Sequence, residues 1–414
     1  MIPVEETATL LDDSALGVLC THLGQIPVGK QPIPNGKFTI NWDKFSEVNW
    51  EQLICKAQAE GLAPLMYWLL SKSGRFSAIP ELARNILRIN YYRSWMHNQN
   101  IYKELEVLGQ AFQKAEIPLI VLKGACLGLT VYPDIGLRPM GDLDILVPGS
   151  KISQAIHIAK SFGYYEHFTD EPELSYLNHH ICLNKSGSLG IMVELHEALI
   201  ATKYYKFAVP MDWFWEQTET MDGPTSIRRF NDLLMLTPTA QVLYAATHAM
   251  LQHGGKDAPL RWFYDLDRLI RSYEKRLDWD LLLSQAHIFD WGSALDAALF
   301  KTVACFDTPI PKQVLTSLSG ISDRNQKLVA LKQNQPGTHM LMELQESLSL
   351  KGFARFRYLL ALVVPSPAFM VDRYQVKTFW TIPIYYLIRW KDILKDGFRS
   401  LVLFIRQGSS SNRG

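Results

Sequence analysis

Cysteine is scarce in this chain, and it is not arranged as a metal site or a disulfide framework. The 414 residues include five cysteines, which are scattered and contain no Cys-x-x-Cys pair. A structural zinc site and a disulfide-stabilised secreted fold are therefore disfavoured. Free cysteines are typical of a reducing compartment, so the sequence predicts a cytoplasmic protein.

Long apolar runs and an excess of charge of either sign are also missing. The nearest candidate for a membrane span, FRYLLALVVPSPAFMV, is interrupted by Pro365 and Pro367 and falls short of the roughly 20 residues that a spanning helix needs. The first residues are acidic and lack the basic region of a signal peptide, so none is expected. The formal net charge is +1, so no extensive nucleic-acid surface is expected.

The spacing of apolar residues divides the chain into four regions. Residues 1–115 carry apolar residues at intervals of three and four, which predicts a helical N-terminal region. Residues 116–232 contain short β-rich runs, including HHICLNK and GIMVELH joined by SGSLG, which predict a small mixed sheet with a hairpin. Helical spacing returns in 233–350, and 351–414 form an aromatic and basic helical tail, expected to be disordered at its end. The predicted fold class is α+β.

Two aspartates stand one residue apart in an apolar strand, within PLIVLKGACLGLTVYPDIGLRPMGDLDILVP, residues 118–148. Side chains on a strand alternate, so Asp142 and Asp144 project to the same face. Two close carboxylates repel each other unless a cation neutralises them, and Mg²⁺ prefers such oxygen ligands. Glu194, in the strand MVELH, supplies a third carboxylate for a site with two metal ions. A solvated strand end is the alternative, because Asp-x-Asp is common.

Positive charge and a glycine precede the aspartates. Gly124 allows the chain to turn from a strand into a helix whose N–H groups can face a phosphate. Lys123 and Arg138 are then candidates for contacting the β- and γ-phosphates of a triphosphate. The structural alternatives are an exposed lysine at a strand end, and an arginine paired with Asp134 or Asp142.

Histidines form a further set of candidates. His196 shares a strand face with the third carboxylate, so it could orient a metal ligand or activate an acceptor. His179 and His180 alternate faces, so only one of them is expected to point at the site. His248 and His253 are five residues apart, a poor spacing for chelation, and roles in the core or as a helix cap are expected.

The run LKGACLGLTVYPDIGLRPMGDLDILV resembles the uncharacterised nucleotidyltransferase family of the polymerase-β-like superfamily. That superfamily has a glycine-containing turn, an Asp-x-Asp pair and a third acid on a later strand. The resemblance assigns Gly124 to the turn, Asp142 and Asp144 to the metal pair, and Glu194 to the third acid. The turn departs from the usual Gly-Gly or Gly-Ser, because here it reads Lys-Gly-Ala.

Other segments share the resemblance. VELHEAL is similar to the family's acid-x-His segment, LRWFYDLDRLI to a later helix, and PSPAFMVDRY to the C-terminal region. The resemblance implies that Arg261 faces the nucleotide. Arg261 and Asp265 also stand at i, i+4, which is the spacing of a simple intrahelical ion pair. Trp262 and Tyr264 could stack on a base, but an apolar core stripe is the default interpretation.

The resemblance implies a polymerase-β-like core between two helical regions and a Mg²⁺-dependent transfer. In this reaction an NTP gives its NMP to an acceptor hydroxyl and pyrophosphate leaves. Asp142, Asp144 and Glu194 would hold two Mg²⁺ ions, and Lys123, Gly124, Arg138 and Arg261 would bind the NTP. The acceptor stays open between a small molecule, a peptide or protein, and RNA. The alternatives are a non-catalytic nucleotide-binding relative and a toxin-like enzyme that modifies RNA.

The tail combines bulky apolar and basic residues between Lys377 and Arg406. This mixture predicts an amphipathic helix. We expect it to pack on the helical domain with its basic face in water, and peripheral contact with an anionic membrane is the alternative. Nothing in the sequence predicts the oligomeric state.

Overall fold

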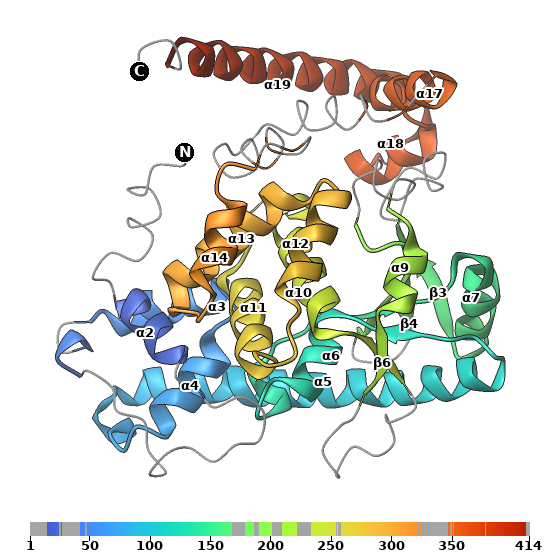
Figure 1. The fold of residues 1–414 in the computed structure, drawn as a ribbon. Helices are drawn as coiled ribbons and strands as arrows, with labels where there is room; N and C mark the ends of the chain where they lie inside the picture. Colours follow the sequence, from blue (N-terminus) through green and yellow to red (C-terminus); the bar gives the residue numbers. More distant parts are fainter. Residues whose placement is uncertain are drawn as a thin grey trace.

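The computed structural model describes most of the chain (Figure 1). The described ranges are 15–24, 42–45, 48–167, 179–185, 190–200, 209–221, 233–253, 258–321, 352–376 and 378–410, together with a few isolated positions between them. Of the expected SGSLG turn, only Gly190 belongs to these ranges.

The described residues form a seven-stranded mixed sheet, which confirms the α+β fold class. Its strands are β1 Ile120–Val121, β2 Asp142–Leu146, β3 Tyr164–His167, β4 His180–Lys185, β5 Met192–His196, β6 Thr218–Thr220 and β7 Leu234–Leu236. They lie in the order β3-β4-β5-β2-β1-β7-β6. Strand β2 is parallel to β5, and β1 is parallel to β7. The other neighbours are antiparallel, including the expected β4–β5 pair.

Helices of the N-terminal region contribute to the cores on both faces of the sheet. They are α2 Ala15–Leu23, η2 Trp42–Phe45, α3 Trp50–Ala59, α4 Ala63–Ser71, η3 Phe76–Ala78 and α5 Glu81–Lys114. Helix α3 begins where the Asn49 side chain accepts a hydrogen bond from the Gln52 N–H, and α4 begins with Pro64 in its first turn. The long helix α5 runs beneath the rest of the molecule (Figure 1) and buries Tyr102, Leu105 and Phe112 in the core that it shares with the sheet.

Shorter helices connect the strands. They are α6 Lys123–Thr130, η4 Ile135–Leu137, η5 Gly149–Lys151, α7 Ile152–Ser161 and α9 Met211–Glu216. The β-rich run IPLIVLK, residues 117–123, forms only the two residues of β1, because Pro118 has no N–H and α6 already begins at Lys123.

A second helical region lies on the face of the sheet opposite to the C-terminal half of α5. It contains α10 Pro238–Thr247, the π-helix η8 His248–Gln252, α11 Leu260–Ser272, α12 Trp279–Ile288, α13 Gly292–Phe306 and α14 Lys312–Leu318. Its buried residues belong to the same apolar cluster as those of the N-terminal helices, for example Phe263 and Trp291 together with Leu19 and Leu65. The second helical region and α2–α4 therefore share one core on one face of the sheet, and the C-terminal half of α5 packs in a separate core on the other face.

The C-terminal segment consists of α17 Gly352–Val363, α18 Pro367–Tyr374, η9 Phe379–Thr381 and α19 Ile382–Ser410. Helix α19 lies along the edge of the molecule, away from the sheet (Figure 1). Met370, Val376 and Ile382 form a small apolar cluster of their own. Among the described residues we find no helix with both the length and the apolar character needed to cross a bilayer.

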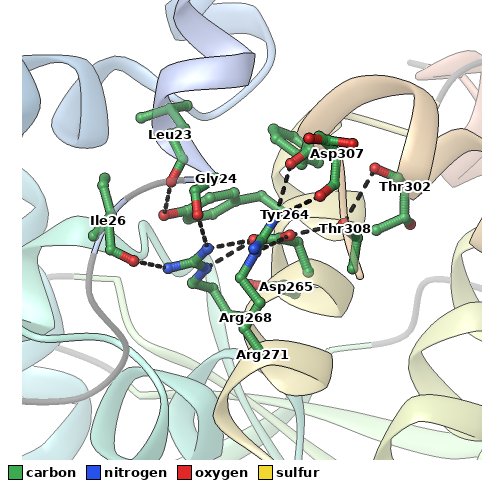
Figure 2. Close-up of polar contacts among 12 residues, drawn as sticks. Leu23, Gly24, Ile26, Tyr264, Asp265, Arg268, Arg271, Thr302, Asp307 and Thr308 are labelled. Atoms are coloured by element: carbon green, nitrogen blue, oxygen red, sulfur yellow. Dashed lines mark hydrogen bonds and ion pairs between the residues drawn. The ribbon is translucent and has the colours of Figure 1, made fainter. Parts of the chain in front are cut away.

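A buried ion pair links the N-terminal helices to α11. Asp267 and Arg268 are both fully buried. Figure 2 shows Arg268 facing the carbonyl groups of Gly24 and Ile26, which follow α2. Arg268 donates to both carbonyl oxygens and to Asp267, and the Asp267 carboxylate also accepts from Arg271 Nε at 2.7 Å. These contacts provide hydrogen-bond donors for two backbone carbonyl groups after α2 that would otherwise be buried without partners.

We expect Asp267→Asn to lower the free energy of unfolding by about 3–5 kcal/mol, because it leaves the Arg268 guanidinium buried without its counter-charge. Urea unfolding followed by circular dichroism measures this change. Asp280→Asn, at an exposed position of α12, is the matched control and should change stability by less than about 0.5 kcal/mol. A loss for Asp267→Asn no larger than that of the control would show that the pair is not a determinant of stability.

Candidate active site

The three predicted carboxylates lie together on one face of the sheet. Strand β2 pairs with β5 so that Asp144 is directly opposite Glu194, and Asp142 is one alternation earlier on β2. Asp144 is only 3% exposed, whereas Asp142 and Glu194 are half-buried. Leu143 and Val193 point to the opposite face and pack in the core that α5 shares with the sheet. The alternation of the two strands therefore brings all three acids to the face that the second helical region covers.

Two basic side chains contact these carboxylates. Lys123 Nζ lies 2.7 Å from Asp144 Oδ1 and 3.9 Å from Glu194 Oε2. His196 Nε2 lies 2.8 Å from the same Asp144 oxygen and 3.3 Å from Glu194 Oε2. Burial by itself would raise the pKa of Asp144. The Lys123 ammonium and the His196 hydrogen bond outweigh burial and hold this pKa well below its usual range. Burial lowers the pKa of His196, but its hydrogen bonds to Asp144 and Glu194 outweigh burial and raise it.

Asp142 has no such counter-charge, since no ion pair or hydrogen bond of its carboxylate is seen in the described part of the chain. Burial, followed by the charges of Asp144 and Glu194, raises the pKa of Asp142 to about 6. Within the described ranges, the charged groups in direct contact with these carboxylates are Lys123 and His196, and neither contacts Asp142. Ligand atoms of Asp144, Glu194 and His196 lie within 4.8 Å of one another, a spacing that can hold a metal ion. A surplus of carboxylate charge with hard oxygen donors fits a divalent cation.

The turn before α6 was expected to depend on the backbone freedom of Gly124, but the structure differs. Lys123, not Gly124, has the left-handed backbone, with φ of 45°. This conformation is uncommon for a lysine and is often found at functional sites. Gly124 is needed for a different reason, because a Cβ there would lie 2.8 Å from the Arg138 guanidinium and 2.9 Å from Met140. The glycine thus allows the Arg138 side chain to pass close to the start of α6.

Arg138 is a buried residue with a carboxylate partner on the second helical region. Its guanidinium donates to both oxygens of Asp265 on α11, with Nη2 2.8 Å from Oδ2, and its Nη1 donates to the Pro139 carbonyl. The Tyr132 hydroxyl donates to the same carboxylate at 2.7 Å. The predicted alternative of an ion-paired arginine is therefore present, but with Asp265 in place of Asp134 or Asp142. Arg138 joins the sheet to the helix that carries Arg261.

Arg261 lies close to this pair without joining it. Because Asp265 pairs with Arg138, Arg261 does not form the intrahelical ion pair that its spacing suggested. Its Nε is buried and has no hydrogen-bond partner in the described residues. Burial, followed by the charge of Arg138, lowers the pKa of Arg261 to about 10, and the charge of Asp142 acts on it as well. A half-buried cation that is close to the carboxylates, with a buried Nε that has no partner in the described residues, is well placed for an anionic ligand.

The histidines gather more closely than the sequence suggested. The expectation that only one of His179 and His180 points at the site is wrong, because both rings lie within 5.3 Å of the His196 ring. Their ring nitrogens approach to 2.9 Å, and burial lowers the pKa of both. The bend at the start of β4 allows this, since His179 precedes the first paired residue. His180 Nε2 also lies 3.7 Å from Glu194 Oε1.

A second group of rings, formed by His248, His253 and Trp262, was not expected from the sequence spacing. His248 and His253 are in contact, with ring centroids 4.6 Å apart, because the π-helix at the end of α10 places residues five apart on one side. Both rings pack against Trp262 of α11, at 5.1 and 4.5 Å. Tyr264, by contrast, is fully buried and donates its hydroxyl to the Leu23 carbonyl, so it belongs to the core.

A small cavity separates α6 from the second helical region. Lys123, Tyr244, His248 and Trp262 are among its lining residues. Its volume is about 40 Å³, which has room for a few water molecules, so a bound nucleotide would have to widen it. The Tyr244 hydroxyl and His248 Nε2 are buried there without hydrogen-bond partners within the described ranges. Sequence analysis did not identify Tyr244, because α10 has the pattern of an ordinary core helix and only the fold brings it to Lys123.

Comparison with known protein families gives a match over more than half of the chain. A search of curated proteins found no relative of this chain. Residues 46–307 match the model of a family described as uncharacterised nucleotidyltransferase. This range spans more than half of the chain and includes β1 to β7 and all of the candidate site residues. The chain therefore belongs to the uncharacterised nucleotidyltransferase family, whose members are transferases.

Proposed function

We propose that the protein is a Mg²⁺-dependent enzyme that transfers an NMP from an NTP to an acceptor hydroxyl and releases pyrophosphate. The observation that carries this proposal is the surplus of carboxylate charge on β2 and β5, with Asp142 unpaired beside Asp144 and Glu194. Two Mg²⁺ ions held by these three residues would supply charge neutralisation for the triphosphate and for the acceptor oxygen.

The protein's own residues would bind the nucleotide and move the proton. Glu194, half-buried and next to His196, is our candidate to accept the proton of the acceptor hydroxyl. Lys123 and Arg261 would bind the triphosphate from opposite sides of the carboxylates, by charge-assisted hydrogen bonds. Gly124 and Arg138 would contribute by holding the start of α6 and α11 in place, and the Arg138 charge adds to the positive potential at the triphosphate.

The base would lie toward the second helical region. Trp262 lines the cavity beside Lys123 and is half-buried, so one face of its indole can stack on a base. The polar atoms of Tyr244 and His248 that lack partners would then be available for hydrogen bonds to the nucleotide. We propose a cytoplasmic location for this reaction, since all five cysteines are free thiols.

Incubation with each α-³²P-labelled NTP, MgCl₂ and a cell extract tests the proposal. We expect label to appear on an acceptor with one preferred NTP, and EDTA to abolish this labelling. Nuclease and protease treatment of the product then separates RNA, protein and small-molecule acceptors. NTP binding with no labelled product and no pyrophosphate would indicate a non-catalytic relative, and label on RNA would favour the toxin-like alternative.

We expect Arg261→Met to raise KM for the NTP at least about tenfold, because a charge-assisted contact with phosphate is worth roughly 1.5–3 kcal/mol. Its Tm should not fall, since burial already disfavours the charged guanidinium and no partner is lost. Pyrophosphate release gives KM, and differential scanning fluorimetry gives Tm. Arg75→Met, at an exposed position outside the site, is the control. An unchanged KM in Arg261→Met would place the triphosphate elsewhere.

A further inference from the structure

The C-terminal segment exposes an unusual amount of apolar surface. Trp380 is 87% exposed, Leu394 73% and Phe398 68%. Phe353 and Phe356 of α17 are likewise exposed. Large exposed side chains of this kind, gathered over neighbouring elements, mark interaction sites on soluble proteins.

Helix α19 is apolar on two opposite faces, and α17 and α18 cover only one of them. On the covered face, the Tyr386 hydroxyl donates to the Pro365 carbonyl, Arg389 donates to the Leu362 carbonyl, and Trp390 Nε1 donates to the Val363 carbonyl at 2.8 Å. The uncovered face carries five exposed apolar residues, namely Ile384, Leu387, Ile388, Leu394 and Phe398. At 100° per residue these positions share one side of the helix.

Basic residues accompany this uncovered face. Lys391 and Lys395 are exposed, and their positions fall within the apolar stripe, between Leu387 and Phe398. Long lysine side chains in such a stripe can extend their ammonium groups to an aqueous or headgroup layer while their stems lie on apolar surface. Arg355 and Arg357 of α17 are exposed as well.

The charge of the whole segment differs in sign from that of the rest of the chain. Residues 351–414 contain 11 basic and three acidic side chains, whereas residues 1–350 contain 31 basic and 38 acidic ones. A second copy of the segment would meet this one with like charge, which disfavours self-association. An anionic bilayer has the opposite charge and an apolar interior, and amphipathic helices with Lys, Trp, Phe and Leu bind at its surface.

We propose that α17–α19 dock the protein on an anionic lipid bilayer, with α19 lying in the plane of the headgroups. Its 29 residues correspond to a rod of roughly 43 Å. The uncovered apolar face enters the boundary between headgroups and acyl chains, and Lys391 and Lys395 contact the lipid phosphates. This inference concerns a surface remote from the carboxylates and does not depend on the proposed function.

Co-sedimentation of the full-length protein with vesicles tests the docking. We expect binding to vesicles of phosphatidylcholine with 30% phosphatidylglycerol, no detectable binding to pure phosphatidylcholine, and weaker binding at 500 mM than at 50 mM NaCl. Equal binding to both vesicles, or binding to neither, overturns the proposal.

Two variants locate the contact. Leu394→Glu/Phe398→Glu and Lys391→Glu/Lys395→Glu should each weaken binding to the anionic vesicles at least about tenfold. Ile288→Glu, at a 65% exposed apolar position of α12, is the matched control and should bind as the wild type does. If both tail variants bind like the wild type, the proposal fails. A dimer of the wild type that dissociates in Leu394→Glu/Phe398→Glu, seen by light scattering, would assign the face to a second copy and would also overturn it.

Discussion

Replacing Asp142 or Asp144 by Asn is expected to lower the rate of nucleotidyl transfer at least about a thousand-fold. Each substitution removes one carboxylate from the site that we propose to hold metal ions. Such ions contribute several kcal/mol of transition-state stabilisation, of which about 4 kcal/mol corresponds to a thousand-fold. The change is isosteric, so the strand pairing of β2 with β5 should persist. Single-turnover formation of labelled product under saturating NTP measures the effect.

The two substitutions should have opposite effects on stability in EDTA. Asp144 is paired with Lys123 and His196, so Asp144→Asn should lower the free energy of unfolding by about 2 kcal/mol. Asp142 is unpaired and repelled by its neighbours, so Asp142→Asn should raise stability above neutral pH. Calorimetry of the metal-free proteins distinguishes these results.

The pH dependence of this difference follows from the pKa of Asp142, which the fold raises from 3.8 to about 6. Below the lower value the carboxyl is protonated in both states and contributes nothing. Between the two values the unfolded chain ionises while the native state keeps its proton, so the native state loses stability as pH rises. The gain from Asp142→Asn should therefore grow through this window and level off above it.

Asp212→Asn, at an exposed position in the first turn of α9, is the control for both measurements. Full transfer activity in either site variant would contradict the assignment of the metal pair. A gain in stability for Asp144→Asn equal to that for Asp142→Asn would contradict the pairing of Asp144 with Lys123.

Loss of the ion pair between Arg138 and Asp265 should have a large effect on both stability and nucleotide binding. Arg138→Gln is expected to lower the free energy of unfolding by about 3–5 kcal/mol, because it leaves the Asp265 carboxylate buried with only the Tyr132 hydroxyl. Because α11 also carries Arg261 and Trp262, we expect KM for the NTP to rise in the same variant. Urea unfolding and steady-state kinetics measure the two effects.

The control for Arg138→Gln is a variant of an ion pair that is not buried. Lys160 and Glu166 form one at the surface, with 48% and 26% of their side chains exposed, and Lys160→Gln should cost no more than about 1 kcal/mol. The double variant Arg138→Met/Asp265→Leu should recover much of the loss, since it removes both buried charges. If Arg138→Gln were no more destabilising than Lys160→Gln, Arg138 would have to be free for the phosphates, as the sequence first suggested.

Much of the catalytic face follows from local rules. Side chains two residues apart on a strand share a face. This alternation is enough to put Asp142 and Asp144 on one face of β2, and Glu194 and His196 on one face of β5. The apolar residues between them have to face a core, so the acids have to face away from it. The mixed sheet and the helices on either side were predictable in the same way, from periodicity and from the resemblance carried by residues 118–148.

Partnerships between distant residues could not be predicted, because they depend on how separate elements pack. Arg138 and Asp265 are 127 positions apart, and only the approach of α11 to the loop before β2 makes them partners. That choice of partner leaves Arg261 without an ion pair among the described residues, although its spacing from Asp265 suggested an intrahelical ion pair. His248 and His253 meet for a related reason, since the widened turn of the π-helix changes which residues share a side.

The sequence by itself determined the chemistry of this protein, namely an Asp-x-Asp pair, a third acid and a basic turn on strands of a small sheet. Its composition also determined that the C-terminal segment is basic and aromatic. Only the tertiary structure decided which cation pairs with which acid and which face of α19 is left uncovered. The physical reason is that side-chain alternation is set within a few residues, whereas the pairing of buried charges and the coverage of apolar faces depend on which elements the whole chain brings together.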